Sequence, residues 1–346
     1  SLWMCCGRIL LRSIWNRQSR LSISGRDALV ESDPLFPKRI SCFCRAYPVE
    51  GRIPVIHLDE SENGEVFVKT RIISALVGIV LLAVVLSFFQ TIVLNVAIMV
   101  IILMAMYEFL TATKISHNKL LSAVAFVVAA AFPYIRLQRE LDLLPLFLLP
   151  YIALLFLILL RTHQDTRVED IALVFMMSIG IPLSLSSAIY LRDNNGYTLG
   201  LYYLLLALFC AWFSDTGAYF TGRAFGKHKL CPLVSPHKTV EGMIGGLVTC
   251  VVLNVLATLG FERGCAQLGI AVQVDMVRLL LISLLASLIS VLGDLSFSMI
   301  KRQFDIKDFG NIMPGHGGVL DRFDSVLFTL PFIYATTLCF PICTLG

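Results

Sequence analysis

The sequence predicts an all-α, polytopic membrane protein with about nine transmembrane helices. Of its 346 residues, 57% are hydrophobic and 15% are charged, whereas soluble domains are roughly 25% charged. Apolar runs recur from residue 71 onward, and each is long enough to cross a hydrocarbon core as a helix. The charged residues after this point are confined to the segments between the runs, so we expect the chain to fold in lipid.

The apolar runs give the individual candidate spans. The third run is short, and the first two are separated only by Gln90, so a count of eight or ten remains open. The runs cover residues 72–89, 91–110, 120–135, 143–160, 171–191, 197–213, 240–261, 277–300 and 323–345.

Basic residues support this count, because an error of one span would scramble their alternation between the two sides of the membrane. The two longest internal loops, 214–239 and 301–322, fall on the same, more basic side. The less basic side carries only Arg136, Arg139, Arg192, Arg263 and Arg278. We therefore expect the polar chemistry on one shared face.

The first part of the chain differs in composition from the rest. Residues 1–68 interleave arginines with serines, and the first acidic residue is Asp27. This composition is typical of an organelle transit peptide, with a basic tail on the membrane surface as the alternative. The expected organisation is a leader over 1–68 and a multi-pass catalytic domain over 69–346.

Composition also excludes some classes. A formal charge of +4 without a long Lys/Arg run argues against a nucleic-acid partner. The ten cysteines include no C-x-x-C pair, so we expect reduced thiols without a metal.

The loop 301–322 is dense in groups that handle phosphates. Arginine binds phosphate as a bidentate fork and lysine as a point charge, while glycines let backbone N–H groups approach a ligand closely. His316 is a further hydrogen-bond donor. The cations are Lys301, Arg302, Lys307 and Arg322, and the glycines are Gly315, Gly317 and Gly318.

Acidic residues flank this loop. Asp294 lies inside an apolar run, where an acid is costly in lipid, and helical spacing puts Ser298 and Lys301 on the same face. Asp321 and Asp324 would face one way if the last helix begins there, as a pair of Mg²⁺ ligands would. The alternative for Asp294 is a structural ion pair with a Lys or Arg.

The loop 214–239 adds a second set of polar groups. We expect Ser235-Pro236 to form a helix N-cap and N1 pair, which would place Lys238 in the first turn beside a bound phosphate. Ordinary capping is the alternative for Ser235 and Thr239, and Gly245-Gly246 is expected to serve close helix packing.

The segment from Ser298 to Asp324 resembles the signature of phosphatidate cytidylyltransferases, read here as S-x-x-K-R-x(4)-K-D-x-G-x(3)-P-G-H-G-G-x-x-D-R-x-D. The segments Ser235-Pro-x-Lys-Thr-x-Glu-Gly and Asp215-x-x-Ala-Tyr, the latter followed by Gly222-Arg223, are similar to further motifs of that family. The resemblance covers roughly residues 69–346.

The resemblance implies a reaction of CTP with phosphatidic acid that gives CDP-diacylglycerol and pyrophosphate, with Mg²⁺ and a possible second cation. It implies Asp294 and Asp321 as the first metal ligands, with Asp324 and Asp215 next. The implied catalytic residues are Lys301, Arg302, Lys307, Asp308, His316, Arg322 and Asp324. The implied substrate-binding residues are Asp215, Arg223, Ser235, Lys238, Thr239, Glu241, Ser298, Gly315, Gly317 and Gly318.

Two other functions stay open from the residues alone. A CTP-dependent polyprenol kinase would also use cations and aspartates, and a secondary transporter would also bury acids in its helices. A bacterial-like core behind a transit-like leader suggests a plastid membrane, with the endoplasmic reticulum as the alternative. A homodimer is one assembly compatible with the sequence.

Overall fold

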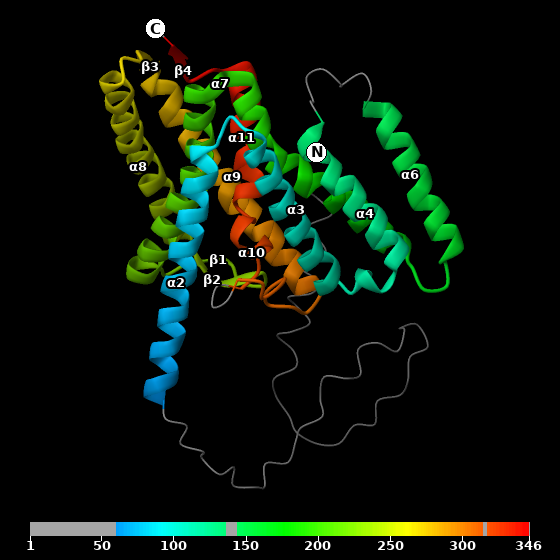
Figure 1. Ribbon diagram of the computed structural model, residues 1–346. Coiled ribbons are helices and arrows are strands. Elements are labelled where there is room, and N and C mark those ends of the chain that lie inside the picture. The colour runs from blue at the N-terminus through cyan, green and yellow to red at the C-terminus, as the bar shows by residue number, and fades with distance from the viewer. Residues whose placement is uncertain (1–59, 136–143, 314–316, 346) are drawn as a thin grey trace, which may run out of the picture. The chain divides into compact units, whose positions relative to one another are not determined.

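The computed structural model describes residues 60–135, 144–313 and 317–345. Expectations on residues 1–59, Arg136, Arg139, Gly315 and His316 lie outside this part. The described chain is a bundle of helices with two small sheets (Figure 1). The helices are α2 (Glu60–Ser87), α3 (Ile92–Ala112), η1 (Ile115–His117), α4 (Lys119–Ala131), η2 (Phe132–Tyr134), α6 (Leu144–Arg161), α7 (Val168–Phe225), α8 (Val240–Gln267), α9 (Met276–Gln303), α10 (Leu320–Phe323) and α11 (Val326–Cys339). The strands are β1 (Lys229–Cys231), β2 (Ser235–Thr239), β3 (Val272–Val274) and β4 (Cys343–Leu345).

The helices have the length and apolarity of an integral membrane protein. Within the described residues, four helices are long and apolar enough to cross a membrane, namely α3, α7, α8 and α9. Shorter apolar helices lie within or overlap α2, α4, α6 and α11. Many large apolar side chains on these helices are exposed, such as Val100, Val248 and Leu281, as expected for surfaces that face lipid. The chain is thus a helical membrane protein, with four full-length candidate spans.

Helix α7 contains a sharp bend. Gly196 has a φ of 73° inside the 58-residue helix, a conformation that glycine adopts without steric cost. A Cβ added at Gly200 would lie 2.9 Å from the Cα of Arg192, whereas eight residues of straight helix span about 12 Å. The chain therefore turns back on itself between the two apolar runs that the sequence separates at this point.

Helices α7 and α8 approach each other closely through glycines. A Cβ added at Gly245 would lie 2.2 Å from the Thr221 hydroxyl, and one at Gly246 would lie 2.7 Å from the Ser214 carbonyl oxygen. The expected packing role of Gly245-Gly246 is therefore confirmed.

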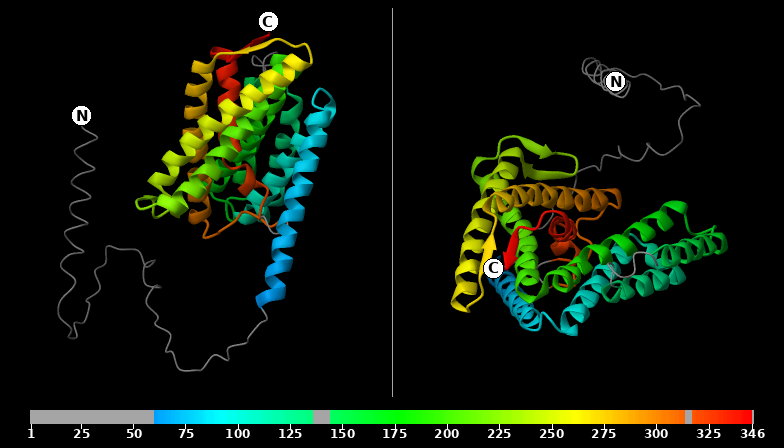
Figure 2. Two further views of the ribbon diagram at one scale, coloured as in Figure 1. Left: turned by 90° about the vertical axis from the view of Figure 1, so that its left-hand side faces the viewer. Right: turned by 90° about the horizontal axis from the view of Figure 1, so that it is seen from above.

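The small sheets lie at opposite ends of the bundle. β1 and β2 form an antiparallel hairpin near α10 at the lower end in Figure 1, and β3 pairs with β4 at the upper end. The side view in Figure 2 shows the same separation. The lower end, made of β1, β2, α10, the segments 304–313, 317–319 and 324–325 and the adjoining residues of α3, α7 and α9, is called the motif end below. It unites the two predicted loops, since Arg302 Nε donates to the Val234 carbonyl oxygen at 3.3 Å.

The predicted helix start at Ser235-Pro236 is wrong. Ser235 pairs with Cys231 in the β1–β2 hairpin, and α8 begins only at Val240, with the Thr239 side chain accepting from Gly242 N at 3.1 Å. Lys238 therefore lies in β2 and not in the first helical turn. A proline is compatible with an edge strand because such a strand has an unpaired side.

Candidate functional site

Asp294 lies on α9 and faces the hairpin. It forms an ion pair with Lys238 of β2, and Ser298 Oγ donates to its Oδ1 at 3.3 Å. The expectation that Asp294 and Ser298 share a helix face is confirmed. An ion pair with a lysine, which the sequence left as the alternative for Asp294, is also present, and both of its side chains keep some access to solvent, 28% for Lys238 and 22% for Asp294.

Two more carboxylates lie close to Asp294. Ser325 joins them, because its hydroxyl donates to Asp215 Oδ2 at 3.1 Å and its backbone N–H donates to Asp324 Oδ1 at 2.7 Å. The negative charge of Asp294 is close enough to repel the charges of both carboxylates. We refer to Asp215, Asp294 and Asp324 as the acid cluster. Like charges at this range repel unless a cation offsets them.

Asp321, at the start of α10, has different partners. Lys301 Nζ pairs with its Oδ1 at 2.9 Å, and the backbone N–H of Phe309 donates to its Oδ2 at 2.8 Å. Only 5% of the Asp321 side chain is exposed. Asp321 and Asp324 thus have different protein partners, and the expectation that they act as one pair of ligands stays a prediction.

Glu108 on α3 is a residue of the motif end that sequence reasoning missed. It is 2% exposed, and its Oε2 accepts from the backbone N–H of Leu320 at 2.8 Å. The available signal was the one used for Asp294, a lone acid in an apolar run.

Three of the predicted substrate-binding residues hold the loop 214–239 and the start of α8. Glu241 accepts from the backbone N–H groups of Lys227 at 3.0 Å and His228 at 3.1 Å. Arg223 Nη1 donates to the Tyr219 hydroxyl at 3.2 Å. Thr239 caps α8, so these three residues contact the protein itself.

The glycine-rich segment brings further predicted residues together. Gly317 has a φ of 86°, and a Cβ added there would lie 4.0 Å from both Asp308 Oδ1 and Arg322 Nη2. Arg302 and Lys307, which lie close to Asp308 in the sequence, are also exposed. The motif end therefore presents Arg302, Lys307, Asp308 and Arg322 on its surface.

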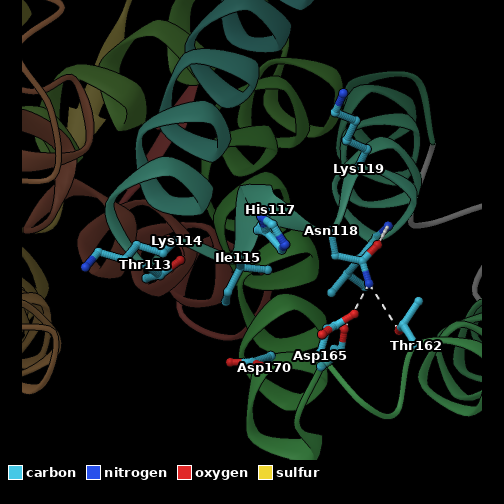
Figure 3. Close-up of a pocket in the computed structure, with 11 residues that line it drawn as sticks. Thr113, Lys114, Ile115, His117, Asn118, Lys119, Thr162, Asp165 and Asp170 are labelled. Atoms are coloured by element: carbon cyan, nitrogen blue, oxygen red, sulfur yellow. Dashed lines mark hydrogen bonds between the residues drawn. The ribbon is translucent and has the colours of Figure 1, made fainter.

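Within the residues that the structure describes, no group of three or more Asp, Glu, His or Cys side chains is arranged so that it could hold a metal ion. A cavity of about 340 Å³ lies elsewhere, between the α3–α4 and α6–α7 connections, as Figure 3 shows. Its Asn118 donates to Thr162 at 3.2 Å and Thr166 at 3.0 Å. None of the predicted site residues lines it, so the candidate site is the open motif end.

Comparison with known proteins finds similarity over the part of the chain that holds these residues. The family model described as "Cytidylyltransferase family" matches residues 69–340. The phosphatidate cytidylyltransferase of Bacillus subtilis (strain 168) is 40% identical over 188 residues, which cover 53% of this chain and 66% of that protein.

Two staphylococcal proteins of the same name are also similar. The one from Staphylococcus saprophyticus is 36% identical over 195 residues, 56% of this chain and 69% of that protein. The one from Staphylococcus aureus (strain COL) is 48% identical over 134 residues, 39% of this chain and 48% of that protein. The chain thus spans between about half and about two thirds of the relatives' length.

Proposed function

The chain belongs to the cytidylyltransferase family, and on this basis we propose that it transfers the cytidylyl group of CTP to phosphatidic acid. An oxygen of the lipid phosphate attacks the α-phosphorus of CTP. The bond between the α-phosphorus and its bridging oxygen breaks, so that CDP-diacylglycerol forms and pyrophosphate leaves.

The observation that carries this proposal is the meeting of acids and cations from distant segments at the motif end. Asp215 comes from α7, Lys238 from β2 and Asp294 from α9. Links between these segments include the Lys238–Asp294 ion pair, the Ser325–Asp215 hydrogen bond and the Arg302–Val234 hydrogen bond. A membrane-edge site of this kind suits a reaction between two anionic phosphates, one of them on a lipid.

The chain's own residues then neutralise and position charge. The attacking phosphate oxygen is already ionised near neutral pH, so the reaction needs no strong general base. Arg302, Lys307 and Arg322 are exposed cations that can hold the nucleotide phosphates and the departing pyrophosphate. Lys238, which pairs with Asp294 of the acid cluster, is a further cation that can bind a phosphate.

The acid cluster fits a divalent cation by the chemistry of its donors. Mg²⁺ prefers one or two carboxylates together with substrate phosphates and water, and Asp215, Asp294 and Asp324 offer oxygens with one paired lysine between them. When bound, Mg²⁺ would reduce the charge repulsion between the two phosphates. The proposed ligands are Asp294 with either Asp215 or Asp324, completed by substrate phosphates and water, and Asp321 is proposed to support the site. A second cation remains part of the proposal.

The proposal also covers topology and location. Nine spans are supported by the bend at Gly196, which divides α7, together with the shorter apolar helices. Cysteines introduced at Lys229 and Asn311 should label from one side of sealed vesicles, and a cysteine at Gln267 from the other. A plastid membrane, with the endoplasmic reticulum as the alternative, and a homodimer are further expectations that fractionation and cross-linking can test.

The decisive assay compares two radiolabelled forms of CTP, one labelled at the α-phosphate and one at the γ-phosphate. With phosphatidic acid and Mg²⁺ in detergent, label at the α-phosphate should enter lipid and label at the γ-phosphate should leave as pyrophosphate. A polyprenol kinase would give the reverse pattern with a polyprenol acceptor, and a transporter would put neither label into lipid. Either result overturns the proposed reaction.

A further inference from the structure

Glu108 reaches from the last turn of α3 into the segment between α9 and α10. Its side chain is 2% exposed, and its Oε2 accepts from Leu320 N, 212 residues further along the chain. Its Oε1 is buried and has no hydrogen-bond partner among the described residues. A buried carboxylate with so few partners is costly, so an aliphatic side chain would serve packing better at this position.

Two glycines of the motif end enclose this carboxylate. A Cβ added at Gly310 would lie 2.5 Å from Glu108 Oε1, and one added at Gly318 would lie 2.7 Å from Glu108 Oε2. Such distances are far inside van der Waals contact. Both glycines therefore leave room for Glu108. Its carboxylate contacts the chain at Gly310, before residues 314–316, and at Gly318, after them.

The residue after Glu108 contacts the same segment. Phe109 is fully buried, and its ring centroid lies 6.3 Å from that of Phe309. The backbone N–H of Phe309 donates to Asp321, and Lys301 Nζ lies 5.7 Å from the centre of the Phe309 ring. The end of α3 thus contacts the segment at Phe309 and at Leu320, directly beside the Lys301–Asp321 pair.

We propose that Glu108 is a positioning residue, which fixes the described parts of the 309–320 segment and thereby the orientation of Asp321 and Arg322 toward the phosphates. The proposal rests on the function argued above. Glu108 acts through its hydrogen bond to Leu320 N and its fit against Gly310 and Gly318. It does not touch the reacting atoms.

The test compares Glu108→Gln with Glu108→Leu in the full chain. Glutamine keeps an oxygen that can accept from Leu320 N, so kcat/KM should stay within about threefold of the unsubstituted protein. Leucine has a similar volume but no acceptor, so kcat/KM should fall at least about tenfold, the order expected when a buried donor loses its partner. An unchanged leucine variant, or an equal loss in both variants, would overturn the proposal, because an equal loss means that the negative charge acts directly.

Hydrogen–deuterium exchange gives a readout that does not depend on turnover. Glu108→Leu should speed the exchange of peptides covering 309–320 and leave α8 peptides unchanged, whereas Glu108→Gln should do neither. Unchanged exchange in the leucine variant would overturn the positioning role. If the unsubstituted protein has no cytidylyltransferase activity, the proposed function fails, and this exchange experiment still decides the role of Glu108.

A glycine substitution tests the same contact if Glu108→Leu does not fold. Gly310→Ala adds a Cβ whose three nearest neighbours are all atoms of Glu108, and it should give the same activity loss and faster exchange. The matched control is Gly264→Ala in α8, where an added Cβ meets nothing within 4 Å, and which should change neither measurement. A Gly310→Ala variant that behaves like this control would overturn the proposal.

Discussion

Two groups of carboxylates at the motif end have opposite surroundings. In the acid cluster, the negative charge of Asp294 repels the charges of Asp215 and Asp324, and Lys238 pairs with Asp294. In the second group, Asp321 and Glu108 accept from backbone N–H groups of the 309–320 segment. Carboxylates that accept from the backbone of a separate segment hold that segment in place, whereas carboxylates that repel one another have a use for an added cation. The residue type alone does not distinguish these two roles.

The largest expected effect is on the acid cluster. Asp294→Asn keeps the shape of the side chain but removes its charge, so kcat should fall by about 100-fold or more, the order for lost charge stabilisation. The melting temperature should change little, because the change also relieves repulsion from Asp215 and Asp324. Turnover and thermal unfolding in detergent measure the two quantities.

A control on the same helix separates these effects from damage to α9. Ser296→Ala removes a hydroxyl that, within the described part of the chain, donates only to the Leu292 carbonyl oxygen at 2.7 Å, and it should leave both quantities unchanged. If Asp294→Asn instead lowers stability and keeps full activity per folded molecule, Asp294 belongs with the structural group and the comparison fails.

The next effect is on the second group. Asp321→Asn removes the charge that faces Lys301, so the free energy of unfolding should fall by about 2 kcal/mol, the order for a hydrogen bond to a charged group. Activity should fall about tenfold, because the 309–320 segment loses one of the two carboxylates, Asp321 and Glu108, that accept from its backbone. The double variant Lys301→Met, Asp321→Asn should recover part of the stability, since no unpaired buried charge remains. Stability equal to that of the unsubstituted protein in the single variant would place Asp321 with the acid cluster.

Sequence reasoning predicted the long helices well because their signal is local. The apolar runs 91–110, 240–261 and 277–300 correspond to Ile92–Ala112, Val240–Gln267 and Met276–Gln303. A run of apolar residues is sufficient to indicate such a helix. The same locality explains the error at Ser235, which looks like a helix N-cap in the sequence but lies in β2 and pairs with Cys231 of β1.

The division among the carboxylates depends on contacts between distant segments. Glu108 meets Leu320 across 212 residues, and no short motif encodes such a contact. Asp321 and Asp324 are three residues apart and look equivalent in the sequence. Their roles separate only because Lys301 and the Phe309 N–H lie beside one of them and Ser325 beside the other.

A smaller effect is expected on metal dependence. Asp324→Asn should raise the Mg²⁺ concentration that gives half-maximal activity by about fivefold, which corresponds to about 1 kcal/mol of lost affinity. Asp321→Asn should leave that concentration unchanged, because Asp321 is assigned to the protein and not to the metal. Mg²⁺ titrations of both variants make the measurement. Equal shifts in the two variants would remove the distinction between the two groups.

The smallest effect is expected from removing residues 1–59, which precede α2. Both carboxylate groups, and every contact described for them, lie between Glu108 and Ser325, so we expect residues 1–59, the first part of the leader, to supply no charge to either group. The truncated protein should keep kcat and the Mg²⁺ requirement within about twofold, because no described hydrogen bond or ion pair of the site is lost. Turnover per folded molecule, with folding checked by thermal unfolding, measures this. A folded, truncated protein without CTP-dependent activity would mean that the two carboxylate groups are not the whole of the charged site, and the leader would then have to be searched for the missing group.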